Sequence, residues 1–276
     1  MPVLGIDIGT GGTRAIVVDR AGAILASATS AHAPFRSPGP AWAEQDPSDW
    51  WRAAVEAVHA VLATGVVAAA DIEGIGLSGQ MHGAVLLDED GEVLRPSIIW
   101  CDQRTAEECR WLDREVGPAR LLELTSNPAL TNFTLTKLLW VRTHEPAIWA
   151  RVRHVLLPKD YVRLRLSGEY AIDMADASGT LMLDVARRRW STEMMDAVGI
   201  SSDILPAVYE SPDVCARVSR EAAAATGLRA GTPIVAGAGD QAAGAVGMGI
   251  TRPGAVSVTI GTSGVVFAAT DEPALD

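Results

Sequence analysis

The sequence has little lysine, few aromatic residues and few cysteines. Its 23 basic residues include two lysines, Lys137 and Lys159, and 34 acidic residues bring the formal net charge to −11. A sequence-independent contact with nucleic acid normally needs a basic surface, so the composition disfavours such a partner. The cysteines at 101, 109 and 215 have no metal-binding spacing and an odd number, which argues against a disulfide framework and suits a reducing cytosol.

Long apolar runs are also missing. Met1-Pro2 leads straight into an apolar strand pattern without a basic region before it, so the sequence predicts neither an export signal nor a membrane span. With 276 residues, of which 48% are hydrophobic, the chain is long enough for one large domain or one and a half, and disorder is excluded.

Alternating helix and strand patterns predict a mixed α/β domain. Apolar runs at 3–7, 13–19 and 24–29, joined by tight turns, predict an antiparallel meander of three strands. Further strands are expected at 72–77, 84–87 and 233–236, and helices after Asp46, at 103–116, 134–149, 160–166 and 219–226, and from Gln241.

Two glycine-threonine turns read almost alike, DIGTGGT at 7–13 and TIGTSGV at 259–265. Each lies between two apolar strand patterns, and its small residues expose backbone N–H groups beside hydroxyls such as those of Thr10 and Thr13. Two such turns facing each other would bind a polyphosphate. The alternative is a pair of tight hairpins in which Asp7 only caps the first turn.

Asp240 lies between a predicted strand and a predicted helix, where two interpretations compete. A carboxylate there could accept a hydroxyl proton during phosphoryl transfer. Asp is also among the best N-cap residues, and by sequence chemistry alone the cap is the favoured interpretation.

Seven short motifs together resemble the FGGY family of carbohydrate kinases, and they run in order through nearly the whole chain. They are DIGT at 7–10, SGQMHG at 78–83, IWCDQR at 99–104, KLLW at 137–140, LPKDY at 157–161, GAGD at 237–240 and GTSG at 261–264. Within the family the xylulose-phosphorylating branch is the most similar. The chain departs from the family at Gly11, where Ser is usual, and at Asn132.

This resemblance implies an actin-like ATPase (ribonuclease H-like) fold of two lobes. Residues 1–248 would form an N-terminal sugar-binding lobe with a mixed sheet flanked by helices, and 249–276 would begin a C-terminal nucleotide-binding lobe, so the chain looks incomplete. The implied reaction is ATP- and Mg²⁺-dependent phosphorylation of D-xylulose at its C5 hydroxyl, weak or absent in this chain alone. A cytoplasmic location, a small sugar as partner and a homodimer are expected with it.

The resemblance also implies a role for individual residues. Asp240 would be the general base; Met81, His82, Asp240 and Gln241 would contact the sugar; Thr10, Gly11, Gly12, Arg14, Gly261, Thr262 and Ser263 would contact phosphates; and Asp7 would orient Mg²⁺, through water.

Several alternatives remain open from the residues themselves. A lone histidine such as His82 is as often a packing residue as a ligand, Trp100 could flank the sugar or lie in the core, and Lys137 is interpreted as structural. Asp173 and Asp176 are interpreted as turn residues. For the whole chain, the rivals are a kinase for ribulose, gluconate or glycerol, a non-catalytic sugar-binding module, and an ATPase of the chaperone or actin type.

Overall fold

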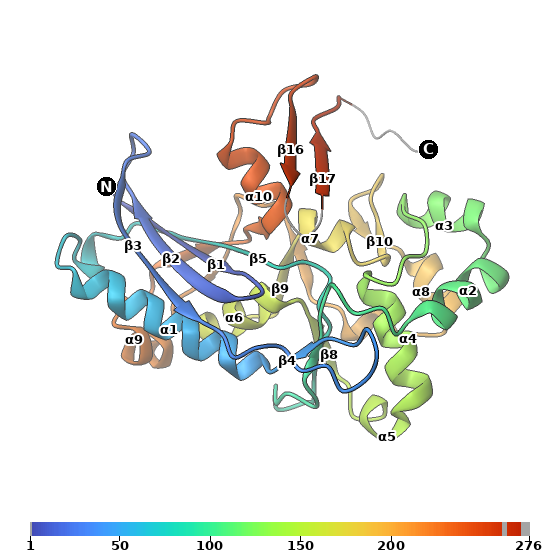
Figure 1. Cartoon of the computed structure of the whole chain (residues 1–276). Helices are drawn as coiled ribbons and strands as arrows, with labels where there is room; N and C mark the ends of the chain where they lie inside the picture. The colour runs from blue at the N-terminus through green and yellow to red at the C-terminus, as the bar shows by residue number, and fades with distance from the viewer. Residues whose placement is uncertain (1, 261–263, 272–276) are drawn as a thin grey trace.

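A mixed sheet organises one part of the protein, whose computed structural model describes residues 2–260 and 264–271 (Figure 1). The strands β1 (Val3–Ile8), β2 (Gly12–Val18) and β3 (Ile24–Ala31) form the predicted antiparallel meander. The strands β5 (Ile75–Gly79), β14 (Pro233–Val235) and β13 (Val214–Arg217) continue the sheet in the order β13-β14-β5-β1-β2-β3. β5 runs parallel to both β1 and β14.

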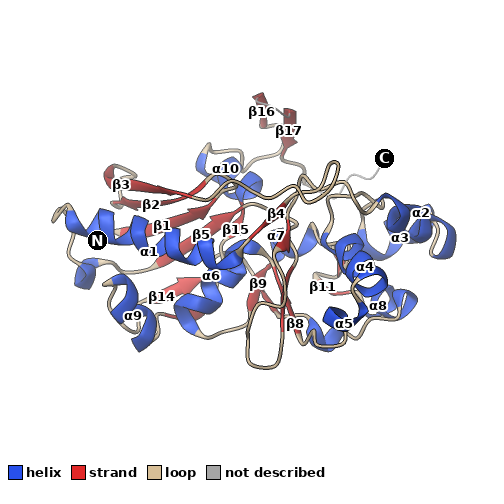
Figure 2. Ribbon diagram, turned by 60° about the horizontal axis from the view of Figure 1, so that its bottom comes forward, coloured by secondary structure: helices blue, strands red, loops and turns tan. Residues whose placement is uncertain are grey.

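Helices cover one face of this sheet. They are α1 (Pro47–Ala63), α6 (Pro158–Ser167) and α9 (Arg220–Thr226), seen together on the same side in Figure 2. Asp46 caps α1 as its side chain accepts a hydrogen bond from Ser48 N, and Pro47 occupies the first turn, where its missing N–H costs nothing. Trp50 of α1 is fully buried against the strands.

A second, mainly helical part has its own hydrophobic core. Its helices are α2 (Ala106–Glu115), α3 (Pro118–Thr125), α4 (Thr134–His144), α5 (Pro146–Trp149) and α8 (Thr192–Val198), gathered on the right of Figure 1. The predicted helix at 134–149 is two helices, because Pro146 lacks the N–H that would continue α4 and instead begins α5. α3 and α8 were not among the predicted helices.

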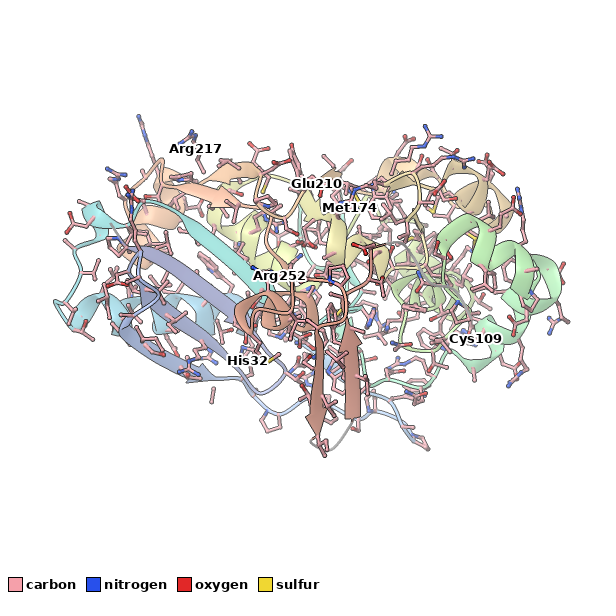
Figure 3. The ribbon with its side chains drawn as sticks, turned by 90° about the horizontal axis from the view of Figure 1, so that it is seen from above. His32, Cys109, Met174, Glu210, Arg217 and Arg252 are labelled. Carbon is pink, nitrogen blue, oxygen red and sulfur yellow. The ribbon has the colours of Figure 1, made fainter. Side chains whose placement is uncertain are left out.

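Short elements connect the two parts. The two-stranded pairs are β4 (Glu44–Gln45) with β7 (Ser97–Ile98), β6 (Val85–Leu87) with β8 (His154–Leu156), β9 (Ala171–Asp173) with β12 (Ala207–Tyr209), and β10 (Leu183–Asp184) with β11 (Arg189–Trp190). Three further short helical elements are α7 (Met174–Ser178), η1 (Ala69–Asp71) and η2 (Ser202–Ile204). In Figure 3, Arg217 of β13 lies in the sheet part and Cys109 of α2 in the helical part.

A glycine bend brings the chain from β14 back alongside β5. Gly237 has φ +77°, and a Cβ there would lie 2.0 Å from Leu77 O, so only glycine fits. β15 (Ala238–Gly239) then pairs in parallel with β5, and α10 (Asp240–Gly247) follows directly. α10 lies over the face of the sheet opposite α1 and α6 (Figures 1 and 2).

The last hairpin, β16 (Val256–Ile260) with β17 (Gly264–Ala268), stands away from the sheet (Figure 1). Its apolar side chains are unusually exposed, with Ile260 at 87%, Val266 at 72% and Val258 at 63%. Among the helices of residues 2–260 and 264–271, none has the length and apolar character needed to cross a bilayer.

Candidate active site

The carboxyl ends of three neighbouring parallel strands meet at one edge of the sheet. β1 and β15 both pair with β5, and the register places Asp7 opposite Ser78 and Ser78 opposite Ala238. Because Asp240 follows β15 directly, it reaches the edge where Asp7 lies. Parallel strands of α/β sheets bind ligands at their carboxyl ends. The topology therefore brings together two carboxylates from distant parts of the chain.

Asp240 and Asp7 interact electrostatically. Partial burial and, second, the negative charge of Asp7 raise the pKa of Asp240 above its ordinary value, while hydrogen bonds from Gln241 act in the opposite direction. Asp240 is the first residue of α10, and Gly239 occupies the N-cap position without a side-chain cap. The N-cap interpretation of Asp240 is therefore wrong. A carboxylate with a raised pKa is a stronger proton acceptor than an ordinary one.

Asp7 faces a pocket between the sheet and α10. Ser78 Oγ, on the neighbouring strand β5, donates to Asp7 Oδ1 at 2.6 Å. Because this bond is not made within the glycine turn, the turn-capping interpretation of Asp7 is not supported. Arg14 lies opposite Asp7 on β2, and its exposed side chain donates to Ser27 Oγ at 3.0 Å. The pocket of about 560 Å³ is lined by Asp7, Arg14, Ser78 and, from α10, residues that include Val246.

The first glycine turn exposes backbone. Gly9 N donates to Gly12 O at 3.0 Å, which closes the turn, and an added Cβ at Gly11 would meet open space. Gly12 is needed for another reason, since its Cβ would lie 2.8 Å from Ser30 O of β3. Exposed turns of this kind bind anions through their N–H groups.

Thr10 and Thr13 have different surroundings. Thr10 Oγ1 accepts a hydrogen bond of 2.9 Å from Trp100 Nε1, and Gln45 Nε2 donates to Thr10 O at 2.7 Å. Trp100 is 37% exposed, so its side chain does not lie in the core. Thr13 is fully buried, with its Oγ1 2.8 Å from His32 Nε2. Contrary to the expectation, the Thr13 hydroxyl is therefore not exposed beside the N–H groups of the turn.

His82 is held on several sides. Its Nδ1 lies 2.7 Å from Gly179 O and must carry a hydrogen, because a carbonyl can only accept. Burial, followed by the charge of Lys137, lowers the pKa of His82 to about 4, so the ring is neutral at pH 7. Its edge packs on Phe133 with ring centroids 5.2 Å apart. In this tautomer Nε2 is a hydrogen-bond acceptor.

Met81 packs against β15, and Gln241 follows Asp240 on α10. A Cβ added to Gly239 would be 2.7 Å from Met81 Cγ, so Met81 packs directly on the backbone that precedes Asp240. Gln241 is exposed on α10. The remaining predicted phosphate contacts, Gly261, Thr262 and Ser263, lie outside the residues that the structure describes.

A fully buried group of charges behind Asp240 was missed by the sequence analysis. Lys159 Nζ lies 2.6 Å from Asp160 Oδ1 and 2.9 Å from Asp176 Oδ2, and it also pairs with Asp173. Burial lowers the pKa of Lys159, but the three carboxylates outweigh burial and the pKa is raised overall. Asp173 does cap the turn that begins α7, since its Oδ1 accepts from Asp176 N at 2.8 Å, but the expectation of turn residues missed that both carboxylates are buried partners of Lys159. The LPKDY motif was the available signal for Lys159.

This charged group contacts the strand that carries Asp240. A Cβ added to Gly239 would lie 2.9 Å from Asp176 Oδ1, and Arg163 donates to Ala236 O from the same side. Burial raises the pKa of Asp176 to about 8. Arg163 thus binds the backbone before the Gly237 bend, and Asp176 packs against the backbone after it.

The carboxylates at the site suit a hard cation that keeps most of its water. Among residues 2–260 and 264–271 there is no group of three or more His, Cys, Asp or Glu side chains arranged to hold a metal. Mg²⁺ is commonly bound through one or two carboxylates together with substrate phosphates and water. Asp7, which lines the pocket, fits such a role.

Comparison with known proteins gives a consistent result. Residues 2–247 match the model of the FGGY family of carbohydrate kinases, N-terminal domain. A xylulose kinase of Klebsiella pneumoniae is 46% identical over 268 residues, which are 97% of this chain and 54% of that protein. The chain therefore spans about half the length of the curated relatives it matches.

Solved structures agree. The crystal structure of a xyloylose kinase from Brucella ovis superposes with a TM-score of 0.91 at 43% identity, over 98% of this chain and 55% of that one. A gluconate kinase from Lactobacillus acidophilus superposes with a TM-score of 0.93 at 25% identity, over 100% of this chain and 55% of that one. The mixed sheet with flanking helices is thus the fold expected from the sequence.

Proposed function

This chain belongs to the FGGY family of carbohydrate kinases, and from that premise we propose that it serves the transfer of the ATP γ-phosphate to the C5 hydroxyl of D-xylulose. The products are xylulose 5-phosphate and ADP. The names of its relatives support the substrate class. The observation that carries the proposal is Asp240 beside Asp7, with a raised pKa, at the edge of the sheet where β1, β5 and β15 end.

In this proposal Asp240 is the general base. The C5 hydroxyl oxygen attacks the γ-phosphorus while its proton passes to the Asp240 carboxylate, and the bond to the ADP oxygen breaks. The transition state is loose, so holding the hydroxyl in line with the phosphorus contributes more than the strength of the base. Burial and Asp7 nevertheless strengthen the base by raising its pKa.

The other residues divide between sugar and nucleotide. His82 Nε2 accepts a hydrogen bond from a sugar hydroxyl, and the Gln241 amide donates or accepts one. Met81 packs beside the sugar carbons. On the other side, the backbone of Thr10, Gly11 and Gly12, the Arg14 cation and the turn at 261–263 contact phosphates. Mg²⁺, held near Asp7 through water, would neutralise charge on the transferred group.

We also propose that residues 1–248 form a sugar-binding lobe and that 249–276 open a nucleotide-binding lobe. The exposed apolar side chains of β16 and β17 support a hairpin that belongs to a larger sheet. By this proposal the 276 residues alone bind xylulose weakly and transfer phosphate poorly or not at all. A homodimer and a cytoplasmic location stay predictions.

Gluconate is the strongest alternative substrate, since a gluconate kinase shares the fold closely. The test measures sugar-dependent ADP formation by the full-length product of the gene with D-xylulose, D-ribulose, D-gluconate and glycerol, and by the 276-residue chain alongside. We expect the highest kcat/KM for D-xylulose. A preference for another sugar corrects the substrate, whereas ADP release that no sugar stimulates contradicts the kinase. Robust turnover by the 276 residues alone contradicts the weak-activity proposal.

A further inference from the structure

Lys137 lies in the first turns of α4 with its side chain completely buried. Its Nζ donates to His82 O at 3.0 Å, to Phe133 O at 3.4 Å and to Asn132 O. Within residues 2–260 and 264–271, no carboxylate lies within ion-pair distance of this ammonium. Burying a lysine ammonium that contacts only backbone carbonyls costs free energy of folding. A functional role for these contacts is therefore expected.

One of those carbonyls belongs to an unusual residue. His82 has φ +66°, in the left-handed region that residues other than glycine rarely adopt. Its carbonyl also accepts a hydrogen bond from Thr134 Oγ1 at 3.2 Å. Two donors from the start of α4 therefore hold the peptide of His82 in this conformation.

The ring of His82 is fixed at its opposite end. Gly179 O accepts from Nδ1 at 2.7 Å, and the ring has little room there, since a Cβ at Gly179 would lie 2.8 Å from His82 Cε1. With the ring fixed by Gly179 and the carbonyl by Lys137, the direction of Nε2 follows from both contacts.

We propose that Lys137 is a positioning residue for sugar binding: its ammonium holds the His82 carbonyl, and through it the acceptor atom Nε2, in the orientation that a sugar hydroxyl requires. The inference rests on the proposed function only in taking a sugar as the ligand of His82. Lys137 itself does not touch the ligand.

The charge of Lys137 makes this role sensitive to pH. Burial lowers the pKa of Lys137 to about 7; Asp102 and the thiols of Cys101 and Cys109 act to raise it, and Arg104 to lower it further. Above this pH the neutral amine has two N–H groups for three carbonyls, so its hold on His82 O weakens.

Asp176, whose pKa burial raises to about 8, titrates in the same pH window, whereas the other groups near the site titrate outside it or act in another direction. His82 titrates near 4, and burial raises the pKa of Cys101 and raises that of Cys109 to about 11. Asp240 also has a raised pKa, but its ionisation with rising pH supplies an acceptor to the sugar. A loss of sugar affinity between pH 6.5 and 8.5 is therefore assigned to Lys137, rather than to Asp176, only if it disappears when Lys137 is replaced.

The test measures the dissociation constant of D-xylulose by calorimetry at several pH values, without nucleotide, using the full-length gene product. For the unmodified protein we expect a roughly threefold to tenfold rise in Kd between pH 6.5 and 8.5, from the loss of one hydrogen-bond donor. Lys137→Met should raise Kd about tenfold at pH 6.5 and abolish the pH dependence. kcat at saturating sugar should change little in comparison.

Two variants guard against a purely structural effect. Lys137→Gln keeps amide donors but cannot titrate, so it should bind with an intermediate Kd that does not change with pH. Thr136→Val is the matched control, because the Thr136 hydroxyl donates to Phe133 O at 2.8 Å on the same helix without touching His82. It should lower the melting temperature and leave Kd unchanged.

The outcomes separate this inference from the proposed function. If the protein binds gluconate or ribulose instead of D-xylulose, the substrate is wrong and the same measurements are made with the sugar that binds. If sugar binds with a pH-independent Kd, or if Lys137→Gln titrates as the unmodified protein does, the inference is overturned. If Lys137→Met does not fold, the inference is decided by the pH dependence of Kd in the unmodified protein and in Lys137→Gln. Binding of no sugar at all overturns both proposals.

Discussion

The two sides of the site are built differently. On the side of His82, a ring nitrogen and a main-chain carbonyl are both held by buried groups, Gly179 and Lys137. On the side of the first glycine turn, Gly11 meets open space and the Arg14 side chain is exposed. The difference suits their proposed ligands, because selecting among sugar hydroxyls needs fixed acceptors, whereas a phosphate chain needs accessible N–H groups and positive charge.

Asp240 belongs to both sides. It follows Gly239, on which Met81 packs, and its pKa responds to Asp7 at the end of β1. If the two sides act independently, substitutions on one should change the KM for one substrate, and those at Asp240 should change kcat. Substitutions on each side and at Asp240 test that division.

The largest effect is expected for Asp240→Asn, which keeps the size of the side chain but removes the base. We expect kcat to fall by about 10²-fold to 10⁴-fold, the usual contribution of a general base. The Kd of D-xylulose should stay within about threefold, because an amide still accepts a hydrogen bond. Steady-state kinetics and calorimetry on one preparation measure both. An unchanged kcat in a folded variant would remove Asp240 from the mechanism.

Asp7→Asn should have the next largest effect and a distinct pH signature. Loss of a carboxylate that orients a hydrated Mg²⁺ should reduce kcat/KM for ATP by roughly tenfold to a hundredfold. Removing the negative charge should also lower the pKa of Asp240, because Asp7 is one of the causes that raise it. The base then stays ionised to lower pH, so the acid limb of the pH–rate profile should move downward.

Ser78→Ala is the matched control for Asp7→Asn. It removes the 2.6 Å hydrogen bond to Asp7 Oδ1 but leaves the negative charge in place. The acid limb should therefore not move downward as it does in Asp7→Asn. Equal shifts in the two variants would mean that the interaction between Asp7 and Asp240 is not the cause.

Local sequence patterns predicted much of the sheet, but not on which face of the sheet every side chain lies. The meander of β1, β2 and β3 was predicted because tight turns and alternating apolar residues are local signals. The error at Thr13 could have been avoided, since a period of two places Thr13 on the same face of β2 as Ala15 and Val17, both fully buried. Hydroxyls in a glycine turn attracted the functional interpretation instead.

Buried charges could not be predicted in the same way. Whether Asp176 is an exposed turn residue or a buried partner depends on Lys159, which comes from another element, and on the packing of both behind β15. The same holds for Lys137, whose carbonyl partner His82 is far away in the sequence. Motif resemblance marked these positions, but only the fold assigns their contacts.

His82→Ala should affect the sugar side alone. Loss of one acceptor costs about 1 kcal/mol, which corresponds to a rise of roughly fivefold to tenfold in the KM for D-xylulose, with the KM for ATP unchanged. His82→Asn is the control, because asparagine tolerates the left-handed conformation and keeps an acceptor. The KM of His82→Asn for D-xylulose should lie between those of the unmodified protein and His82→Ala. A change in the KM for ATP as large as that for the sugar would contradict the separation of the two sides.

Trp100→Phe should have the smallest effect, and on the nucleotide side. It removes the indole N–H that donates to Thr10 Oγ1 at 2.9 Å while keeping an aromatic ring. Without that donor the hydroxyl of the phosphate turn is less well oriented, so we expect the KM for ATP to rise about twofold to threefold, the lower range for one hydrogen bond. A double-mutant cycle with Thr10→Val decides the cause. If the two side chains act through this one bond, the double variant is no worse than Thr10→Val alone. Effects that simply add, or that raise the KM for the sugar instead, would assign Trp100 to the other side of the site.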